Sequence, residues 1–282
     1  MAIESVGIIG AGQMGNGIAH VSALAGYKVI LVDISQTALE NALKTIEKNL
    51  ARQLEKQKIS QTQMDVALRN IAINADVAAL SDVDLLIEAA TEDFDLKIRI
   101  LSNALKHIKQ NCLLASNTSS LSITKLASTT DRPEKFIGLH FMNPVPIMKL
   151  VELISGAATS SETMATLTHF AESLGKTVAK AEDYPGFIAN RILMPMINEA
   201  IYTLFEGVGD VEAIDTCMKL GMGHPMGPLQ LADFIGLDTC LAVMNVLHDG
   251  FGDSKYRPCP LLVKYVDAGW LGVKSGRGFY SY

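Results

Sequence analysis

The stretch GIIGAGQMGNGIAH, residues 7–20, decides the fold of the first half of the chain. It begins with an apolar run typical of a buried strand and ends in an apolar pattern typical of a helix. Three glycines, Gly10, Gly12 and Gly15, lie between the two patterns. Because glycine permits tight turns and close backbone contacts, the stretch predicts a strand, a tight turn and a helix packed closely on that strand.

The same alternation of short apolar runs and longer helical patterns continues to about residue 184. The apolar runs are SVGIIG, KVILVD, VDLLIEAA, CLLAS and KFIGLH, which begin at residues 5, 28, 83, 112 and 135. Continuous apolar strands separated by helices are typical of a parallel sheet that is covered on both faces. We therefore predict a doubly wound, mostly parallel α/β domain of Rossmann-like topology over residues 1–184.

The pattern changes at Pro185-Gly186, after which strand signals mostly stop. Helical periodicity runs through GFIANRILMPMINEAIYTLFEG, which begins at residue 186, and further helical runs are expected near residues 210–220, 228–249 and 258–268. A Pro-Gly pair between two different patterns is a typical domain boundary. We predict a second, all-helical domain over residues 185–282.

A helical hairpin, about residues 36–70, is predicted as an insertion between the second and third strands of the first domain. Its first helix interleaves apolar residues with a basic set, namely Lys44, Lys48, Arg52, Lys56 and Lys58. Such a face is either an ordinary solvated surface or a binding surface for phosphate. The pattern alone leaves both interpretations open.

The amino-acid composition limits which classes of protein and which kinds of binding partner are expected. Of the 282 residues 49% are hydrophobic and 19% are charged, which is typical of a globular protein, and the net charge of -6 argues against nucleic acid or an anionic membrane as a partner. No secretory signal and no apolar run of membrane-spanning length is visible, so a cytoplasmic location is expected. The cysteines have no metal-binding or disulfide-framework spacing, and no metal is expected: they are Cys112, Cys217, Cys240 and Cys259.

An acidic residue, Asp33, ends the second strand, about 20 positions after the glycine pattern. In this context the turn and the helix N-terminus bind a pyrophosphate, and the carboxylate accepts hydrogen bonds from a ribose. Because a carboxylate repels a 2′-phosphate, we predict NAD rather than NADP as the cofactor. A glycine-rich packing turn without a ligand is the simpler alternative, which the strand–turn–helix context disfavours. The predicted loop contacts are Gly10, Ala11, Gly12, Gln13, Met14 and Gly15.

His140 and Glu152 are the candidates for acid–base chemistry. His140 ends the strand KFIGLH, at the edge where open α/β sheets bind their ligands. Glu152 lies inside the apolar run IMKLVELI, where an unpaired carboxylate would cost roughly several kcal/mol. We predict that Glu152 pairs with His140 and orients it as a general base, which takes the proton of an alcohol as hydride leaves carbon.

Small polar side chains offer further candidates. SNTSSLSI, residues 116–123, follows the strand CLLAS, and some of its hydroxyl groups are expected to cap the next helix. Asn190 lies early in the first helix of the second domain, near Pro195, whose missing N–H frees the carbonyl of Arg191. An amide at such a bend is a candidate for reaching a substrate across the domain boundary.

Long segments of the chain resemble one family, the L-3-hydroxyacyl-CoA dehydrogenases. The similar segments, in this order, are GAGQMGNGIA, LLIEAATED, ASNTSSLSIT, GLHFMNPVPIMKLVE, PGFIANRILMPMINEA, MKLGMGHPMGP and GWLGVKSGRGFY, so the likeness covers essentially the whole chain. The resemblance implies NAD-dependent interconversion of a short-chain (S)-3-hydroxyacyl-CoA, such as 3-hydroxybutanoyl-CoA, and its 3-oxoacyl-CoA. It also implies a homodimer that forms through the helical domain.

The resemblance implies roles for individual residues. His140 is the implied base with Glu152 as its partner, while Ser119 and Asn190 hold the acyl carbonyl and the 3-oxygen. The implied cofactor contacts beyond the glycine loop are Asp33, Glu92, Lys97, Ser119, Asn143 and Lys274. The implied contacts to coenzyme A are Asn49 and Lys56, with Arg52 as an expected helper. Met142 replaces a frequent phenylalanine beside the histidine.

Two other functions remain open from the residues themselves. A dehydrogenase for free β-hydroxyacids or sugar acids would keep His140 but has less need of a basic helical insertion. A non-catalytic NAD-binding structural or sensor protein would not need the combination of Ser119, His140, Glu152 and Asn190.

Overall fold

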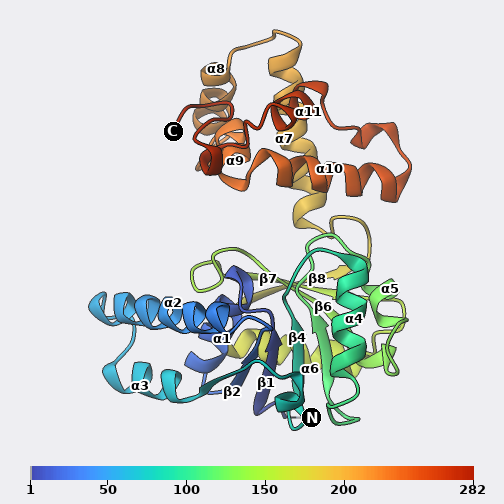
Figure 1. Cartoon of the computed structure of the whole chain (residues 1–282). Helices are drawn as coiled ribbons and strands as arrows, with labels where there is room; N and C mark the ends of the chain where they lie inside the picture. The colour runs from blue at the N-terminus through green and yellow to red at the C-terminus, as the bar shows by residue number, and fades with distance from the viewer. Residues whose placement is uncertain (1) are drawn as a thin grey trace. The chain divides into compact units, whose positions relative to one another are not determined.

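The structure of the protein is a computed structural model that describes residues 2–282. The chain forms two compact units that divide between Asp183 and Tyr184. This division lies one residue before the boundary predicted from Pro185-Gly186. The first unit is built around a sheet and the second is helical (Figure 1).

The first unit contains one eight-stranded sheet within the described residues, in the order β3-β2-β1-β4-β5-β6-β7-β8. The strands are β1 (Ser5–Ile9), β2 (Lys28–Val32), β3 (Ile71–Asn74), β4 (Leu85–Glu88), β5 (Leu113–Ser116), β6 (Phe136–Phe141), β7 (Leu150–Ser155) and β8 (Thr177–Glu182). Pairs from β3 through β6 are parallel, β7 is antiparallel to β6, and β8 is parallel to β7. The prediction of a doubly wound, mostly parallel sheet is confirmed.

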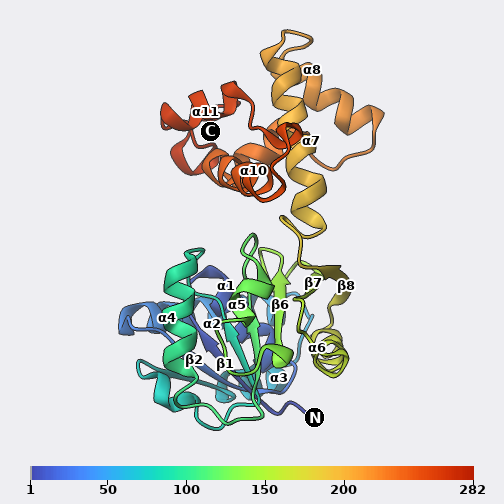
Figure 2. The same ribbon diagram turned by 90° about the vertical axis from the view of Figure 1, so that its right-hand side faces the viewer.

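Helices cover both faces of the sheet (Figure 2). The helices of this unit are α1 (Gln13–Leu24), α2 (Gln36–Glu55), α3 (Gln61–Arg69), α4 (Phe94–Ala104), α5 (Ile123–Ala127) and α6 (Ser161–Ser173). On β6, Ile137 and Leu139 join the core that α1 and α6 cover. A Cβ atom on Gly138 would lie 2.8 Å from Ile123 of α5, so this strand is buried on both sides, as its continuous apolar sequence indicates.

The insertion predicted near residues 36–70 is a pair of helices, α2 and α3. Side chains cap both N-termini: Ser35 accepts a hydrogen bond at the start of α2, and Ser60 forms a reciprocal capping box with Gln63 at the start of α3. One stripe of α2, which includes Leu39, Ile46 and Leu50, is fully buried, while the opposite face is polar and exposed. The insertion is therefore docked on the first unit through an amphipathic helix.

The second unit consists of α7 (Ala189–Phe205), α8 (Val211–Thr216), a π-helical turn η3 (Cys217–Gly221), α9 (Pro228–Ile235), α10 (Leu237–Phe251) and α11 (Pro260–Asp267). The run expected near residues 228–249 is two helices, α9 and α10, bent by 98° at Gly236. Gly236 has a φ of +100°, which a residue with a side chain rarely adopts and which no helix contains. This backbone conformation turns the chain between α9 and α10, so that both helices bury apolar residues in the same core.

No single helix among residues 2–282 is both long and apolar enough to cross a membrane. Together, the bent pair of α9 and α10 has the length and composition that a membrane span requires. Its apolar side chains, such as Leu237 and Met244, are buried inside the helical unit.

Candidate active site

The glycine loop between β1 and α1 depends on two close backbone contacts. Gly10 has a φ of +107°, and a Cβ atom there would lie 2.6 Å from the carbonyl oxygen of Ala89. A Cβ atom on Gly15 would lie 1.7 Å from the carbonyl oxygen of Gly10. Gly12 differs, because nothing in the described part of the chain lies within 4 Å of a Cβ atom placed there. Gly10 and Gly15 therefore shape the turn, while Gly12 leaves its outer face open.

Residues around Gly12 fit a dinucleotide. Gly12 is the N-cap of α1, and no side chain of residues 2–282 caps this helix end, so its first N–H groups and the positive end of its dipole are suited to binding an anion. Asp33, at the end of β2, accepts hydrogen bonds from the backbone N–H of Ala11 at 2.8 Å and of Ser35 at 2.9 Å. The carboxylate therefore lies directly beside the open glycine loop, where the ribose of a dinucleotide is expected.

The strand pairing brings His140 and Glu152 together. The two residues are direct partners in the antiparallel register of β6 and β7, and His140 Nδ1 lies 2.8 Å from Glu152 Oε2. Both side chains are buried, with Glu152 only 1% exposed. Because an ionised carboxylate only accepts hydrogen bonds, Nδ1 carries the proton in this contact. In the neutral ring, Nε2 then has the lone pair that a general base needs.

The hydroxyl group of Ser119 lies on the other side of the imidazole ring, with Oγ 3.1 Å from His140 Nε2. Ser119, His140 and Glu152 thus form a continuous line of polar contacts. Glu92 holds the turn that presents Ser119: its Oε1 accepts hydrogen bonds from the backbone N–H groups of Ser119 and Ser120 at 2.8 and 2.9 Å and from the Thr118 hydroxyl at 2.7 Å.

The contacts of Glu92 bear on the chemistry that Ser119 can perform. A serine nucleophile requires nearby N–H groups that are free to stabilise an oxyanion. Here the N–H groups of Ser119 and Ser120 already bond to Glu92, and that of Leu121 bonds to the Thr118 hydroxyl at 2.9 Å. The turn is therefore built to offer the Ser119 hydroxyl as a hydrogen-bonding group beside a histidine base.

A buried ion pair that the sequence did not predict lies at the end of β4, next to the glycine loop. Lys97 Nζ donates to Glu88 Oε2 at 2.5 Å, and the Ser116 hydroxyl donates to the same oxygen at 2.7 Å. Glu88 Oε1 accepts a hydrogen bond from the backbone N–H of Ala90. Ala90 in turn lies close to the glycine loop, because its Cα would be only 2.7 Å from a Cβ atom placed on Gly10. The signal that could have revealed Glu88 is the one used for Glu152, a carboxylate in an apolar strand run.

The other predicted residues lie in several parts of the chain. Glu92 and Lys97 come after β4, with Lys97 Nζ 3.9 Å from Glu92 Oε2, and Asn143 is the second residue after β6. Asn190 lies in the first turn of α7, and Lys274 pairs with Asp238 at 2.5 Å, both within the helical unit. The residues predicted to bind coenzyme A are on α2 or at its C-terminal end, namely Asn49, Arg52 and Lys56.

Within the described ranges, no three histidine, cysteine, aspartate or glutamate side chains are placed to bind a metal ion.

Two family descriptions match the chain. Residues 5–184 match "3-hydroxyacyl-CoA dehydrogenase, NAD binding domain", and residues 186–282 match its C-terminal domain. The chain is 60% identical over 280 residues to a 3-hydroxybutyryl-CoA dehydrogenase of Bradyrhizobium diazoefficiens, covering 99% of this chain and 96% of the relative. It is 54% identical to a probable 3-hydroxybutyryl-CoA dehydrogenase of Bacillus subtilis, covering 100% and 98%. A crystal structure of (S)-3-hydroxybutyryl-CoA dehydrogenase from Ralstonia eutropha is similar, with a TM-score of 0.98, 50% identity and coverage of 100% and 99%.

Proposed function

The chain belongs to the 3-hydroxyacyl-CoA dehydrogenase family and is an NAD-dependent enzyme that oxidises 3-hydroxyacyl-CoA, and we propose that its substrate is short-chain, with His140 as the general base. The preference for a short chain, 3-hydroxybutanoyl-CoA, is supported by the substrates named for the similar bacterial enzymes. The role of His140 is supported by its position between the Ser119 hydroxyl and the Glu152 carboxylate.

The chain's own residues would divide the chemistry as follows. NAD, when bound, supplies the acceptor for the hydride that leaves C3 of the substrate. His140 Nε2 takes the proton of the 3-hydroxyl group, and Glu152, 2.8 Å from Nδ1, stabilises the imidazolium that forms. The Ser119 hydroxyl is released from Nε2 to donate a hydrogen bond to a substrate oxygen. In the reverse direction, the same imidazolium returns the proton to the 3-oxygen.

The observation that carries this proposal is the Ser119–His140–Glu152 line at the carboxyl edge of a sheet with an open glycine loop. The direct test is oxidation of NADH by the purified protein with acetoacetyl-CoA, with free acetoacetate as the comparison substrate. Rapid turnover of the thioester and slow turnover of the free acid are expected. A reversed preference would favour the free β-hydroxyacid dehydrogenase, and no turnover of either would favour a non-catalytic protein.

Cofactor preference is proposed to depend on Asp33, whose carboxylate borders the glycine loop. The double change Asp33→Gly and Ile34→Arg removes a charge that repels a 2′-phosphate and adds a bidentate phosphate partner, at a position where Ile34 is 97% exposed. We expect the ratio of kcat/KM for NADP to that for NAD to rise, measured by steady-state kinetics. Ile34→Arg alone is the control, and an unchanged ratio in the double variant would mean that Asp33 does not face the ribose.

Binding of the nucleotide end of coenzyme A is proposed for the exposed face of α2. Asn49, Arg52 and Lys56 are spaced by three and four residues, so they lie on one side of the helix and its C-terminal end. Arg52 and Lys56 are exposed, and neither forms an ion pair with a carboxylate among residues 2–282. Two unpaired cations on one face are suited to binding phosphate groups.

Lys56→Ala is expected to raise KM for acetoacetyl-CoA with little change in kcat. The contact lies far from the reacting carbon, so it contributes equally to ground state and transition state. Acetoacetyl-pantetheine, which lacks the nucleotide, is the control substrate, and on it the variant and wild type should perform alike. The exposed Lys58→Ala serves as the matched variant. An equal loss on both substrates would indicate that Lys56 acts through folding or helix placement.

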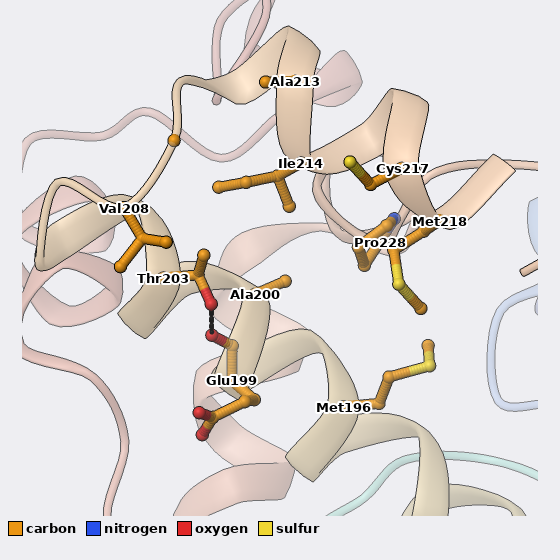
Figure 3. Close-up of a pocket in the computed structure, with 11 residues that line it drawn as sticks. Met196, Glu199, Ala200, Thr203, Val208, Ala213, Ile214, Cys217, Met218 and Pro228 are labelled. Atoms are coloured by element: carbon orange, nitrogen blue, oxygen red, sulfur yellow. Dashed lines mark hydrogen bonds between the residues drawn. The ribbon is translucent and has the colours of Figure 1, made fainter. Parts of the chain in front are cut away.

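A homodimer through the helical unit is also proposed. This unit has an apolar cavity of about 440 Å³, into which Met196, Ile214 and Met218 project (Figure 3). Val208 at its edge is 76% exposed and Phe205 on α7 is 53% exposed. Surfaces that combine an apolar hollow with exposed apolar side chains are typical of self-association. Sedimentation equilibrium at micromolar concentration should give twice the chain mass, and a monomer would contradict the proposal.

We propose a cytoplasmic location. The four cysteines are free thiols, three of them buried, which suits a reducing compartment. Fractionation of the source cells, with the protein detected by antibody, tests this directly, and recovery outside the cytoplasmic fraction would contradict it.

A further inference from the structure

The turn between β6 and β7, residues 142–149, links the strand of His140 to the strand of Glu152. It begins next to the catalytic pair and contains Asn143, one of the predicted cofactor contacts. The N–H groups of Ile147 and Met148 both donate to the carbonyl oxygen of Pro144, at 3.0 Å each, which closes the turn on itself. Any displacement of this turn would move Asn143 relative to the glycine loop.

Lys176 holds this turn from the start of β8, the strand that pairs with β7. It lies between α6 and β8, and its Nζ donates to the carbonyl oxygens of Val145 at 2.5 Å and Met148 at 2.8 Å. No other hydrogen bond from the described residues reaches these two carbonyls. The adjacent backbone N–H of Thr177 also donates to the carbonyl of Lys149 at 2.7 Å, so the start of β8 fastens the second half of the turn.

The Lys176 ammonium is unusual because it is buried without a counter-ion. The residue is 9% exposed, and no carboxylate in the structurally described chain lies within 4.0 Å of it. Burial lowers the pKa of its ammonium group. A buried cation without an acidic partner is costly, whereas an apolar side chain of the same length would fill this space at lower cost. What the ammonium group contributes at this position, and an apolar side chain could not, is the pair of hydrogen bonds to the carbonyls of Val145 and Met148.

The neighbouring side of the turn rests on α1, the helix that begins at the glycine loop. A Cβ atom on Gly17 would lie 2.8 Å from Val145 Cβ, so the turn packs directly on the helix backbone. His20, one turn further along α1, is buried, and burial together with the nearby Lys176 charge lowers its pKa to about 4, against the opposite effect of Gln53. His20 is therefore neutral at physiological pH and leaves Lys176 as the charged group at this site.

We propose that Lys176 is a positioning residue for cofactor binding: together with the Gly17 face of α1, it holds the 142–149 turn so that Asn143 is aligned with the glycine loop. The effect of Lys176 on turnover rests on the proposed function, whereas its effect on NADH binding does not depend on which substrate the enzyme uses. The His140–Glu152 pair is held separately by the β6–β7 ladder. Loss of Lys176 should therefore weaken cofactor binding more than it slows the chemical step.

The test compares Lys176→Met, which keeps the length and removes the charge, with Lys176→Arg, which keeps a donor. Lys176→Met is expected to raise both the KM and the calorimetric Kd for NADH by about 5- to 20-fold, because the turn is no longer held in the position that binds the cofactor, with kcat changed less than about threefold. Lys176→Arg should recover part of the affinity. Lys180→Met, at an exposed position on β8, the strand that follows Lys176, is the matched control and should behave as wild type.

A second variant keeps the proposal testable if Lys176→Met folds poorly. Gly17→Ala leaves Lys176 intact but places a Cβ atom against Val145, so it should also raise the Kd for NADH. An unchanged Kd in folded Lys176→Met, with only a lower melting temperature, would overturn the positioning role. If wild type binds NADH but does not reduce acetoacetyl-CoA, the proposed substrate fails, while the calorimetric comparison of variants still decides the role of Lys176.

Discussion

Replacing His140 by glutamine is expected to lower kcat by about 10²- to 10⁴-fold, the usual contribution of a positioned general base. Glutamine has a similar size and retains polar atoms, but it cannot accept the hydroxyl proton as hydride leaves. The change should leave the Kd for NADH nearly unaltered, because the glycine loop and Asp33 belong to other strands. Steady-state turnover of acetoacetyl-CoA and calorimetric titration of NADH measure the two quantities.

His169→Gln provides the matched control, because the His169 side chain is 84% exposed on α6 and lies far along the chain from the catalytic pair. This variant should retain wild-type kinetics. Turnover near the wild-type rate in His140→Gln would show that another group takes the proton. A parallel loss of kcat and of NADH affinity would instead point to collapse of the site.

Replacing Glu152 by glutamine is expected to have the second largest effect, a fall in kcat of about 10- to 10³-fold. The carboxylate is 1% exposed and meets His140 Nδ1 at 2.8 Å, so its charge is little screened by water. An uncharged amide stabilises the imidazolium less well. Its NH₂ group can also donate to Nδ1, which would place the ring proton on Nε2 and remove the lone pair that the base needs.

The double variant separates this role from an independent one. Because Glu152 acts through His140, the combined loss should be much smaller than the product of the two single losses. Multiplicative losses would mean that Glu152 contributes by another route. Glu182→Gln is the matched control, since Glu182 is an exposed carboxylate on the neighbouring strand β8 and should tolerate the change. Thermal unfolding of each variant checks that the buried site remains folded.

The glycine loop illustrates what local sequence determines. The strand, the turn and the helix of residues 5–24 are adjacent in the chain, so glycine spacing and hydrophobic periodicity are sufficient to predict them. The insertion helices are local in the same sense, because α2 has a continuous apolar stripe and a serine caps each of the two helices. In such elements the deciding contacts lie within a few residues.

The bend between α9 and α10 shows where local signals are ambiguous. Gly236 interrupts a long apolar helical pattern, and a glycine there is compatible with a continuous helix or with a break. The positive φ arises because both helices must bury apolar faces in the same core. Packing, rather than propensity, therefore selects the break.

The sequence by itself determined the α/β class, the glycine loop and the residues from which a catalytic pair could be made. Only the tertiary structure decided that β7 runs antiparallel to β6, which places Glu152 directly opposite His140, and that Lys97 meets Glu88 and Lys176 meets the 142–149 turn. An apolar strand pattern has the same period in either direction, so it carries no information on orientation. A charged residue inside an apolar run indicates that a polar partner is needed. The identity of that partner depends on which distant segments the fold brings within hydrogen-bonding distance.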